Sequence, residues 1–238
     1  MDQYEGFAAI YDQWSAPMTE DVAFYVDLAR KALAQELAQE GGPIVELAVG
    51  TGRVAIPVAA ATGQRVIGID RSPAMLAIAR ERADAAGVEL DLREGDMRDF
   101  ALDEPAALIT CPFRSLLHLP TWADRRRVFE RVAASLLPGG RFAWNAFAFD
   151  PKIAVKLDGQ RQTDTGVPHR IDYVPADNRI AVTLEDGSAI ALWWIARSEW
   201  EGLIDVAGLE VEALYGWFDR RPFDDTSREF VFVARKPT

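Results

Sequence analysis

Two short apolar runs, each with a carboxylate at or near its end, constrain the fold of this chain most strongly. Residues 44–47 contain Glu46 and lead into a turn with Gly50 and Gly52, and residues 66–69 lead into Asp70. Glycines at such a turn let a ligand approach the backbone, and the next helix directs free N–H groups at that ligand. The order predicts two neighbouring parallel strands with a nucleoside-bearing cofactor across their carboxyl ends.

Size and charge limit the classes of protein and partner. The 238 residues suffice for one large α/β domain, and the formal net charge of −11 argues against a nucleic acid or an anionic membrane as partner. The one cysteine, Cys111, excludes an internal disulfide and a cysteine metal cluster. We expect a cytoplasmic protein, because the N-terminal segment does not resemble a signal peptide and no run has the length of a membrane span.

Apolar periodicity predicts alternating helices and strands up to residue 147. Helices are expected at residues 19–40, 54–61, 73–86 and 121–137, and strands at residues 44–47, 65–70, 88–93, 106–110 and 141–147. This alternation implies parallel strand pairing with right-handed crossovers.

After residue 149 the pattern changes to short β segments, expected at residues 170–174, 179–184 and 189–195. We interpret them as an antiparallel insertion over the sheet. A helix at 198–207 and an antiparallel strand pair at 210–215 and 229–234 would then complete the sheet. The prediction is one domain, 1–238, divided into an N-terminal lid and helix (1–40), a cofactor-binding core (41–148), a substrate cap (149–195) and a C-terminal part (196–238).

Three carboxylates narrow the choice of cofactor. Asp70 can accept hydrogen bonds from both hydroxyls of a ribose, although a turn or capping aspartate is the alternative. Glu46 would repel the pyrophosphate of NAD, whereas it suits the ammonium and sulfonium groups of S-adenosylmethionine. Asp96 suits the exocyclic amine of an adenine, against which Met97 would pack. The three together favour S-adenosylmethionine.

The segments Glu-Leu-Ala-x-Gly-Thr-Gly-Arg (46–53), Gly-Ile-Asp-x-Ser-x-x-Met-Leu (68–76), Gly-Asp-Met-Arg (95–98) and Leu-Leu-Pro-Gly-Gly-Arg (136–141) resemble motifs of the class I S-adenosylmethionine-dependent methyltransferases. The resemblance covers roughly residues 40–148. It implies a Rossmann-like, doubly wound, seven-stranded α/β sheet with a reversed last strand, S-adenosylmethionine as cofactor and S-adenosylhomocysteine as product. One departure is Ala48, where many members have glycine.

The resemblance also assigns roles to residues. It places Glu46, Gly50 and Arg53 at the methionine end of the cofactor, Asp70 at the ribose, and Asp96 and Met97 at the adenine. Tyr4 and Tyr11 would form a lid, although hydrophobic anchoring of the terminus is an equal alternative for Tyr4. The other candidate cofactor-binding residues are Ala48, Gly52, Arg71, Met75 and Cys111.

The substrate side follows from position, because ligand crevices of open α/β sheets lie beyond the strand ends. His118 is the candidate general base, with His169 as the second choice, since histidine titrates in the useful range. Tyr11 is the other candidate catalytic residue. A structural histidine bonded to a backbone carbonyl is the alternative for His118. The run Arg125-Arg126-Arg127 is interpreted as a solvated helix face. The candidate substrate-binding residues are Phe113, Arg114, His118, His169 and Trp193.

The predicted function is methyl transfer to nitrogen or oxygen of a small molecule, by in-line displacement in a closed pocket. No metal site is expected. The alternatives are a protein or peptide N-methyltransferase, a non-catalytic S-adenosylmethionine-binding regulator and, less favoured, an NAD-dependent dehydrogenase. The expected partner is a small-molecule methyl acceptor, with no nucleic acid or membrane, and the protein would be a monomer or a homodimer.

Overall fold

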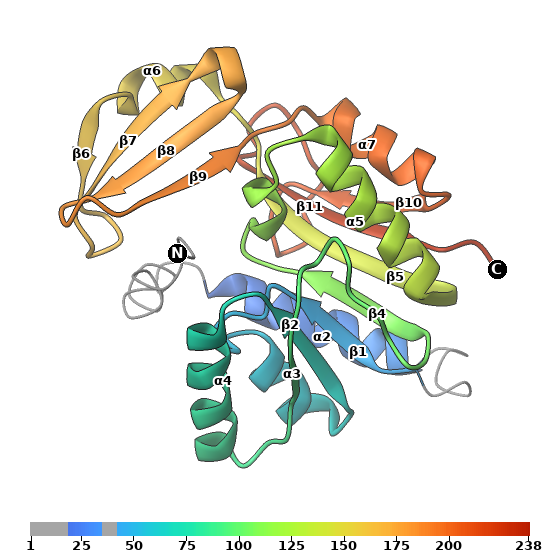
Figure 1. The fold of residues 1–238 in the computed structure, drawn as a ribbon. Helices are drawn as coiled ribbons and strands as arrows, with labels where there is room; N and C mark the ends of the chain where they lie inside the picture. The colour runs from blue at the N-terminus through green and yellow to red at the C-terminus, as the bar shows by residue number, and fades with distance from the viewer. Residues whose placement is uncertain (1–18, 35–41) are drawn as a thin grey trace.

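A seven-stranded sheet forms the centre of the molecule in the computed structural model, which describes residues 19–34 and 42–238 (Figure 1). Its strands are β1 (Ile44–Leu47), β2 (Val66–Asp70), β3 (Asp91–Glu94), β4 (Ala106–Cys111), β5 (Leu136–Phe147), β10 (Glu210–Tyr215) and β11 (Glu229–Arg235). They lie in the order β10-β11-β5-β4-β1-β2-β3. Only β11 runs against its neighbours, so the predicted doubly wound sheet with a reversed last strand is confirmed.

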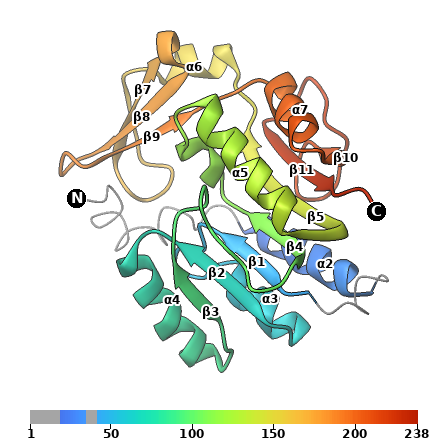
Figure 2. The ribbon, with the colours of Figure 1, turned by 45° about the vertical axis from the view of Figure 1, so that its right-hand side comes forward.

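Helices cover both faces of this sheet (Figure 2). On one face the core includes residues of α2 (Glu20–Ala34), α3 (Ala55–Thr62) and α4 (Pro73–Ala86). On the other face it includes residues of α5 (Trp122–Ser135) and α7 (Arg197–Val206). The chain crosses from the first face to the second between β3 and β4. Because β1 and β4 are neighbours, their carboxyl ends form the crevice where ligands bind in such sheets.

The insertion after β5 forms a second, antiparallel sheet with the order β6-β7-β8-β9. Its elements are α6 (Pro151–Leu157), β6 (Gln160–Gln162), β7 (His169–Val174), the 3-10 turn η3 (Pro175–Asp177), β8 (Arg179–Leu184) and β9 (Ala189–Trp193). The antiparallel insertion was predicted, but α6 and β6 were not. Asp150 caps α6 by accepting a hydrogen bond from the Lys152 N–H, and Pro151 occupies its first turn.

Several predicted boundaries differ from the structure. The third strand begins at Asp91 instead of residue 88, and β5 begins at Leu136, directly after α5. The predicted helix 19–40 is present as α2 up to Ala34, and residues 35–41 lie outside the described part of the chain. The ends of helices and strands are the least certain part of a prediction from sequence patterns. The residues next to an end fit both the helical and the strand periodicity of apolar residues.

The interpretation of residues 125–127 as a solvated face is wrong for Arg125. This side chain is buried, donates to the carbonyl of Leu119 and forms an ion pair with Glu199. Its position three residues before Val128 and four before Phe129 places it on the apolar face of α5. Arg126 and Arg127 are exposed and ion-paired, as predicted for a solvated face.

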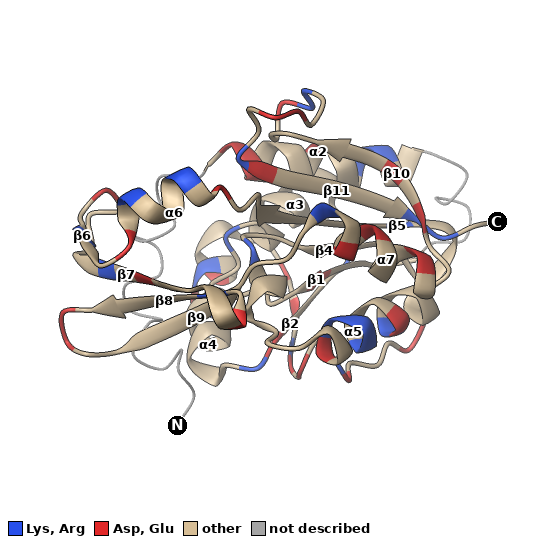
Figure 3. Ribbon diagram, turned by 90° about the horizontal axis from the view of Figure 1, so that it is seen from above, with Lys and Arg blue, Asp and Glu red and all other residues tan. Residues whose placement is uncertain are grey.

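Lys and Arg positions are distributed among Asp and Glu positions over many elements of the described chain (Figure 3). No helix among the described residues has the length and apolar character needed to cross a membrane.

Candidate active site

The turn after β1 approaches the end of β2 through its backbone. Ala48, Gly50 and Gly52 all have positive φ angles, of 54°, 54° and 78°. A Cβ atom at Gly52 would lie 2.9 Å from the Ile56 side chain, so this position accepts only glycine without rearrangement. Ala48 also adopts this left-handed region, which glycine reaches without the steric cost of a side chain.

Asp70 connects this turn to the start of α4. Its carboxylate accepts a hydrogen bond from the Gly50 N–H at 2.8 Å and another from the Ser72 N–H at 2.9 Å. Each carboxylate oxygen has two lone pairs, so both can still accept from the hydroxyls of a ribose. The Ser72 hydroxyl in turn accepts from the Met75 N–H and caps α4.

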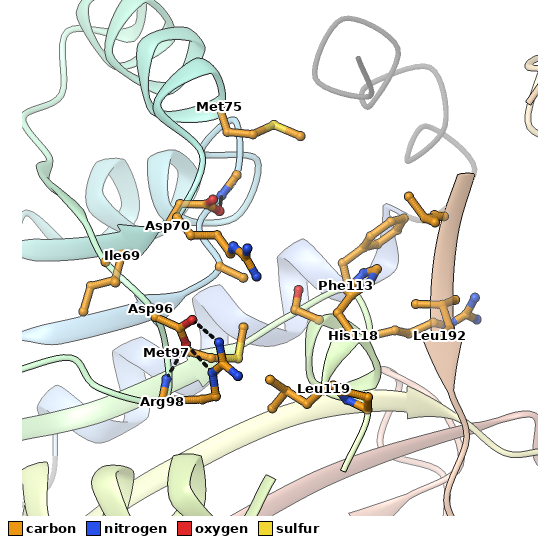
Figure 4. A pocket seen from close by; sticks show the side chains of 18 residues that line it. Ile69, Asp70, Met75, Asp96, Met97, Arg98, Phe113, His118, Leu119 and Leu192 are labelled. Carbon is orange, nitrogen blue, oxygen red and sulfur yellow. Dashed lines mark hydrogen bonds and ion pairs between the residues drawn. The ribbon is translucent and has the colours of Figure 1, made fainter. Parts of the chain in front are cut away.

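A cavity of about 220 Å³ lies beyond the ends of β1, β2 and β4 (Figure 4). It brings together ten residues predicted from the sequence: Ala48, Gly50, Asp70, Arg71, Met75, Asp96, Met97, Phe113, Arg114 and His118. Eight further residues line it: Ile69, Gly95, Arg98, Ser115, Leu119, Pro120, Ile190 and Leu192. Asp70 and Met75 lie on one side of the cavity, and Phe113, His118 and Leu192 lie on the other.

Arg98 holds Asp96 at the cavity wall. Its guanidinium donates to both oxygens of Asp96, at 2.9 and 2.6 Å, and to Asp124 at the start of α5, at 2.9 Å. These hydrogen bonds lower the pKa of Asp96, so its carboxylate stays ionised. The sequence analysis did not assign Arg98 to the site, although its spacing of two residues from Asp96 on a turn was a usable signal.

A buried group of charges lies behind the turn. Glu46 is 4% exposed, and burial, with smaller contributions from Asp21 and Asp70, raises its pKa, while Arg53 opposes this rise. Arg53 is held by two hydrogen bonds to the buried Asp21, at 2.8 and 2.6 Å, and lies 4.9 Å above the Phe113 ring. A cation bound next to this group would favour the ionised form of Glu46.

Phe113 and Arg114 follow β4 with positive φ angles of 55° and 64°. Two consecutive non-glycine residues in this region indicate that surrounding contacts fix the loop. Arg114 donates to both oxygens of Glu229 on β11, a fully buried carboxylate that also accepts from the Asn145 amide at 2.6 Å. The Tyr25 hydroxyl donates to that amide's oxygen. This chain of contacts determines where the Arg114 guanidinium lies.

His118 lies in the cavity and contacts β9 of the insertion. Its Nδ1 is 3.2 Å from the carbonyl oxygen of Ala191, and because a carbonyl only accepts, Nδ1 donates. Burial lowers the pKa of His118 to about 4, more than the hydrogen bond to Ala191 raises it. The ring is therefore neutral at pH 7 and carries its lone pair on Nε2. Both sequence interpretations of His118 agree with its position, since it lines the cavity and also bonds a backbone carbonyl.

The other predicted residues that the structure describes do not line this cavity. Cys111 is fully buried in the core, where burial raises the pKa of its thiol, and Trp193 does not line the cavity. Gly52, Glu46 and Arg53 do not line the cavity either, although Arg53 contacts Phe113, which does. His169 lines a second cavity, whose wall includes Arg114. Tyr4 and Tyr11 lie outside the described residues.

Comparison with known proteins decides the family. The model of a methyltransferase domain matches residues 44–140. A relative from Streptomyces fradiae, named dTDP-3-amino-3,6-dideoxy-alpha-D-glucopyranose N,N-dimethyltransferase, is 32% identical over 207 residues, which cover 80% of this chain and 78% of the relative. The chain belongs to the class I S-adenosylmethionine-dependent methyltransferases.

Solved structures share the fold of this methyltransferase over nearly its whole length. The CcbJ methyltransferase from Streptomyces caelestis has a TM-score of 0.78 and 26% identity, covering 97% of this chain and 96% of that one. The S-adenosylmethionine-bound structure of CalS10, an amino pentose methyltransferase from Micromonospora echinaspora, has a TM-score of 0.70 and 23% identity, covering 98% and 97%.

The cofactor of the methyltransferase is S-adenosylmethionine. The residues of the turn and of the cavity suit the chemical groups of this molecule. The turn around Gly50 and Gly52 leaves the backbone open to a ligand, and Asp70 and Asp96 offer carboxylate oxygens to hydroxyl and amine donors. The buried Glu46 behind the turn suits a cationic ligand. The assignment of Glu46 to the methionine end, Asp70 to the ribose and Asp96 to the adenine stays a prediction.

Proposed function

We propose that this methyltransferase transfers a methyl group to a nitrogen or oxygen atom of a small molecule enclosed between the main sheet and the insertion. One observation carries the proposal: the cavity that contains Asp70 and Asp96 is also lined by Ile190 and Leu192 of β9. A site whose far wall is an apolar strand suits a small acceptor, since enclosure excludes water from the reacting atoms. The insertion then acts as the substrate cap.

We propose an amine as the favoured acceptor group. The relative from Streptomyces fradiae is named as an N,N-dimethyltransferase, which supports amine chemistry at this type of site. When bound, S-adenosylmethionine supplies an electrophilic methyl group on a positively charged sulfur. The protein then has to align the acceptor atom with that methyl group and remove a proton from the acceptor atom.

His118 is proposed to accept that proton. Its ring lines the cavity and is neutral at pH 7, so it is in the form that accepts a proton, although its low pKa makes it a weak base. Tyr11, with Tyr4, is proposed to cover the cofactor. If His118→Ala changes turnover by no more than a few-fold at every pH, the role of His118 as base is wrong.

The cofactor part of the proposal is tested by calorimetric titration with S-adenosylmethionine, S-adenosylhomocysteine and NAD. We expect binding of the first two at micromolar concentration and none of NAD, with binding strongly weakened in Asp70→Ala. A panel of small amines and alcohols with radiolabelled S-adenosylmethionine then tests transfer. Methylation of protein or peptide N-termini, with none of small molecules, would contradict the proposed acceptor class. Binding without any transfer would favour a regulatory protein.

A further inference from the structure

A second cavity, of about 260 Å³, lies where the insertion meets the end of β5. Its wall contains apolar side chains from four strands, β5, β7, β8 and β9, and from the segment after β5, among them Phe147, Phe149, Ile171, Ile180 and Val182. Ile180 and Val182 are buried and, two residues apart, lie on the same face of β8. This face of the small sheet therefore points into the cavity. The two cavities adjoin, because Arg114 and Leu192 line both.

The arginines in the wall of the second cavity are neutralised by carboxylates of the protein. Arg114 forms its ion pair with the buried Glu229, with 2.7 Å between Nη2 and Oε2. Arg228 forms an ion pair with Asp150, with 3.2 Å between Nη2 and Oδ2, and both residues line the cavity. Both arginine side chains in the wall of the second cavity therefore already have a counter-charge from the protein. An anion placed here would compete with Glu229 and Asp150.

Aromatic packing fixes one side of the cavity. The Phe149 ring stacks on Trp194 with 4.2 Å between centroids and 6° between planes, and Tyr173 lies 6.1 Å from each. Burial raises the pKa of Tyr173, so its hydroxyl stays protonated at neutral pH. His169, which lines the same cavity, is buried, and its Nδ1 donates to the carbonyl of Val167 at 2.9 Å. The wall is therefore an apolar surface with few, fixed polar groups.

We propose that the second cavity binds the non-reacting part of the methyl acceptor, and that this part is an uncharged apolar ring or chain. The inference rests on the proposed function, since it takes the adjoining first cavity as the place of methyl transfer. An acceptor that spans both would pass Arg114, where the guanidinium, fixed by Glu229, can donate to a neutral oxygen of the acceptor. A nucleoside diphosphate or a carboxylate does not suit the second cavity, because burying a charge without a free counter-charge is costly.

A matched pair of fluorescent probes tests this selectivity. N-phenyl-1-naphthylamine is neutral, and 8-anilino-1-naphthalenesulfonate has the same aromatic body with a sulfonate added. Both are titrated into the full chain with saturating S-adenosylhomocysteine, which keeps them out of the cofactor site. We expect the neutral probe to bind more tightly by roughly tenfold or more. Equal or tighter binding of the sulfonate would overturn the inference and indicate an anion site.

Two pairs of variants locate the probe. Val182→Phe fills the cavity, and Thr183→Phe places the same ring on the other face of β8. Ile153→Glu puts a carboxylate on the cavity wall, and Val155→Glu puts it on the exposed side of α6, away from the cavity. The first member of each pair should weaken binding of the neutral probe by about tenfold, and the second should leave it within about twofold. The glutamate pair applies even if Val182→Phe does not fold.

The probe should also inhibit methyl transfer competitively with the acceptor and not with S-adenosylmethionine. Unchanged probe binding in both Val182→Phe and Ile153→Glu would overturn the inference even if the enzyme is active. Failure of S-adenosylhomocysteine to bind the wild-type protein would instead refute the proposed function. The two failures are therefore distinguishable.

Discussion

At the scale of single residues, Arg114 depends on a partner that is distant in sequence. Its carboxylate partner Glu229 is fully buried, while the Arg114 side chain is 34% exposed. Glu229→Gln removes the buried charge and leaves the arginine without its counter-charge, so we expect a loss of roughly 2 kcal/mol in the free energy of unfolding. Urea denaturation measures this loss. Glu201→Gln, which affects the exposed pair with Arg197, should cost less than about 0.5 kcal/mol, and equal losses would show that burial is unimportant here.

His118 gives a prediction on pH at the same scale. Its pKa falls from 6.5 to about 4 on folding, so the unfolded chain takes up a proton at a pH where the folded protein does not. The stability that the neutral ring contributes is therefore present above about pH 6.5 and is lost as the pH falls towards 4. Denaturation curves at several pH values measure the free energy of unfolding. Between pH 6.5 and 4 this free energy should fall less steeply in His118→Gln than in the wild type. Parallel curves would contradict the lowered pKa.

At the scale of elements, two helices on the same face of the sheet begin differently. Thr121 caps α5 by accepting a hydrogen bond from the Asp124 N–H, whereas Ala196 begins α7 with no side-chain cap. Thr121→Ala should lower the free energy of unfolding by about 1 kcal/mol, and Ala196→Ser, at an exposed position, should raise it by about 0.5 kcal/mol. Thermal and urea denaturation measure both. Changes of the same sign would show that capping does not control these helix ends.

At the scale of the whole molecule, cofactor binding and folding are linked, because the site is assembled from the ends of several strands. S-adenosylhomocysteine at about one hundred times its Kd should raise the free energy of unfolding by about 2.7 kcal/mol. At that same concentration Asp70→Ala should lose most of this increment, and Asp205→Ala, on the exposed side of α7, should keep it. An undiminished increment in Asp70→Ala would remove Asp70 from the cofactor site.

Much of the candidate cofactor side could be predicted because its residues stand at or just after the ends of strands that local patterns identify. Asp70 ends β2, and Gly50 and Asp96 follow β1 and β3, so neighbouring parallel strands bring all three to one edge of the sheet. Hydrophobic periodicity and turn residues identified those strands. The short helix α6 was not predicted because its single buried residue, Ala154, gives no periodic signal.

The sequence by itself determined the order along the chain of the strands and helices of the main sheet, the glycine turn and the carboxylates at the strand ends, since these depend on local patterns. Only the tertiary structure paired Arg114 with Glu229, 115 positions away, and buried Arg125 beside Glu199. It also decided that two adjoining cavities share the wall at Arg114 and Leu192. Such contacts join elements that the chain brings together only when the sheet forms, so no local pattern of residues encodes them.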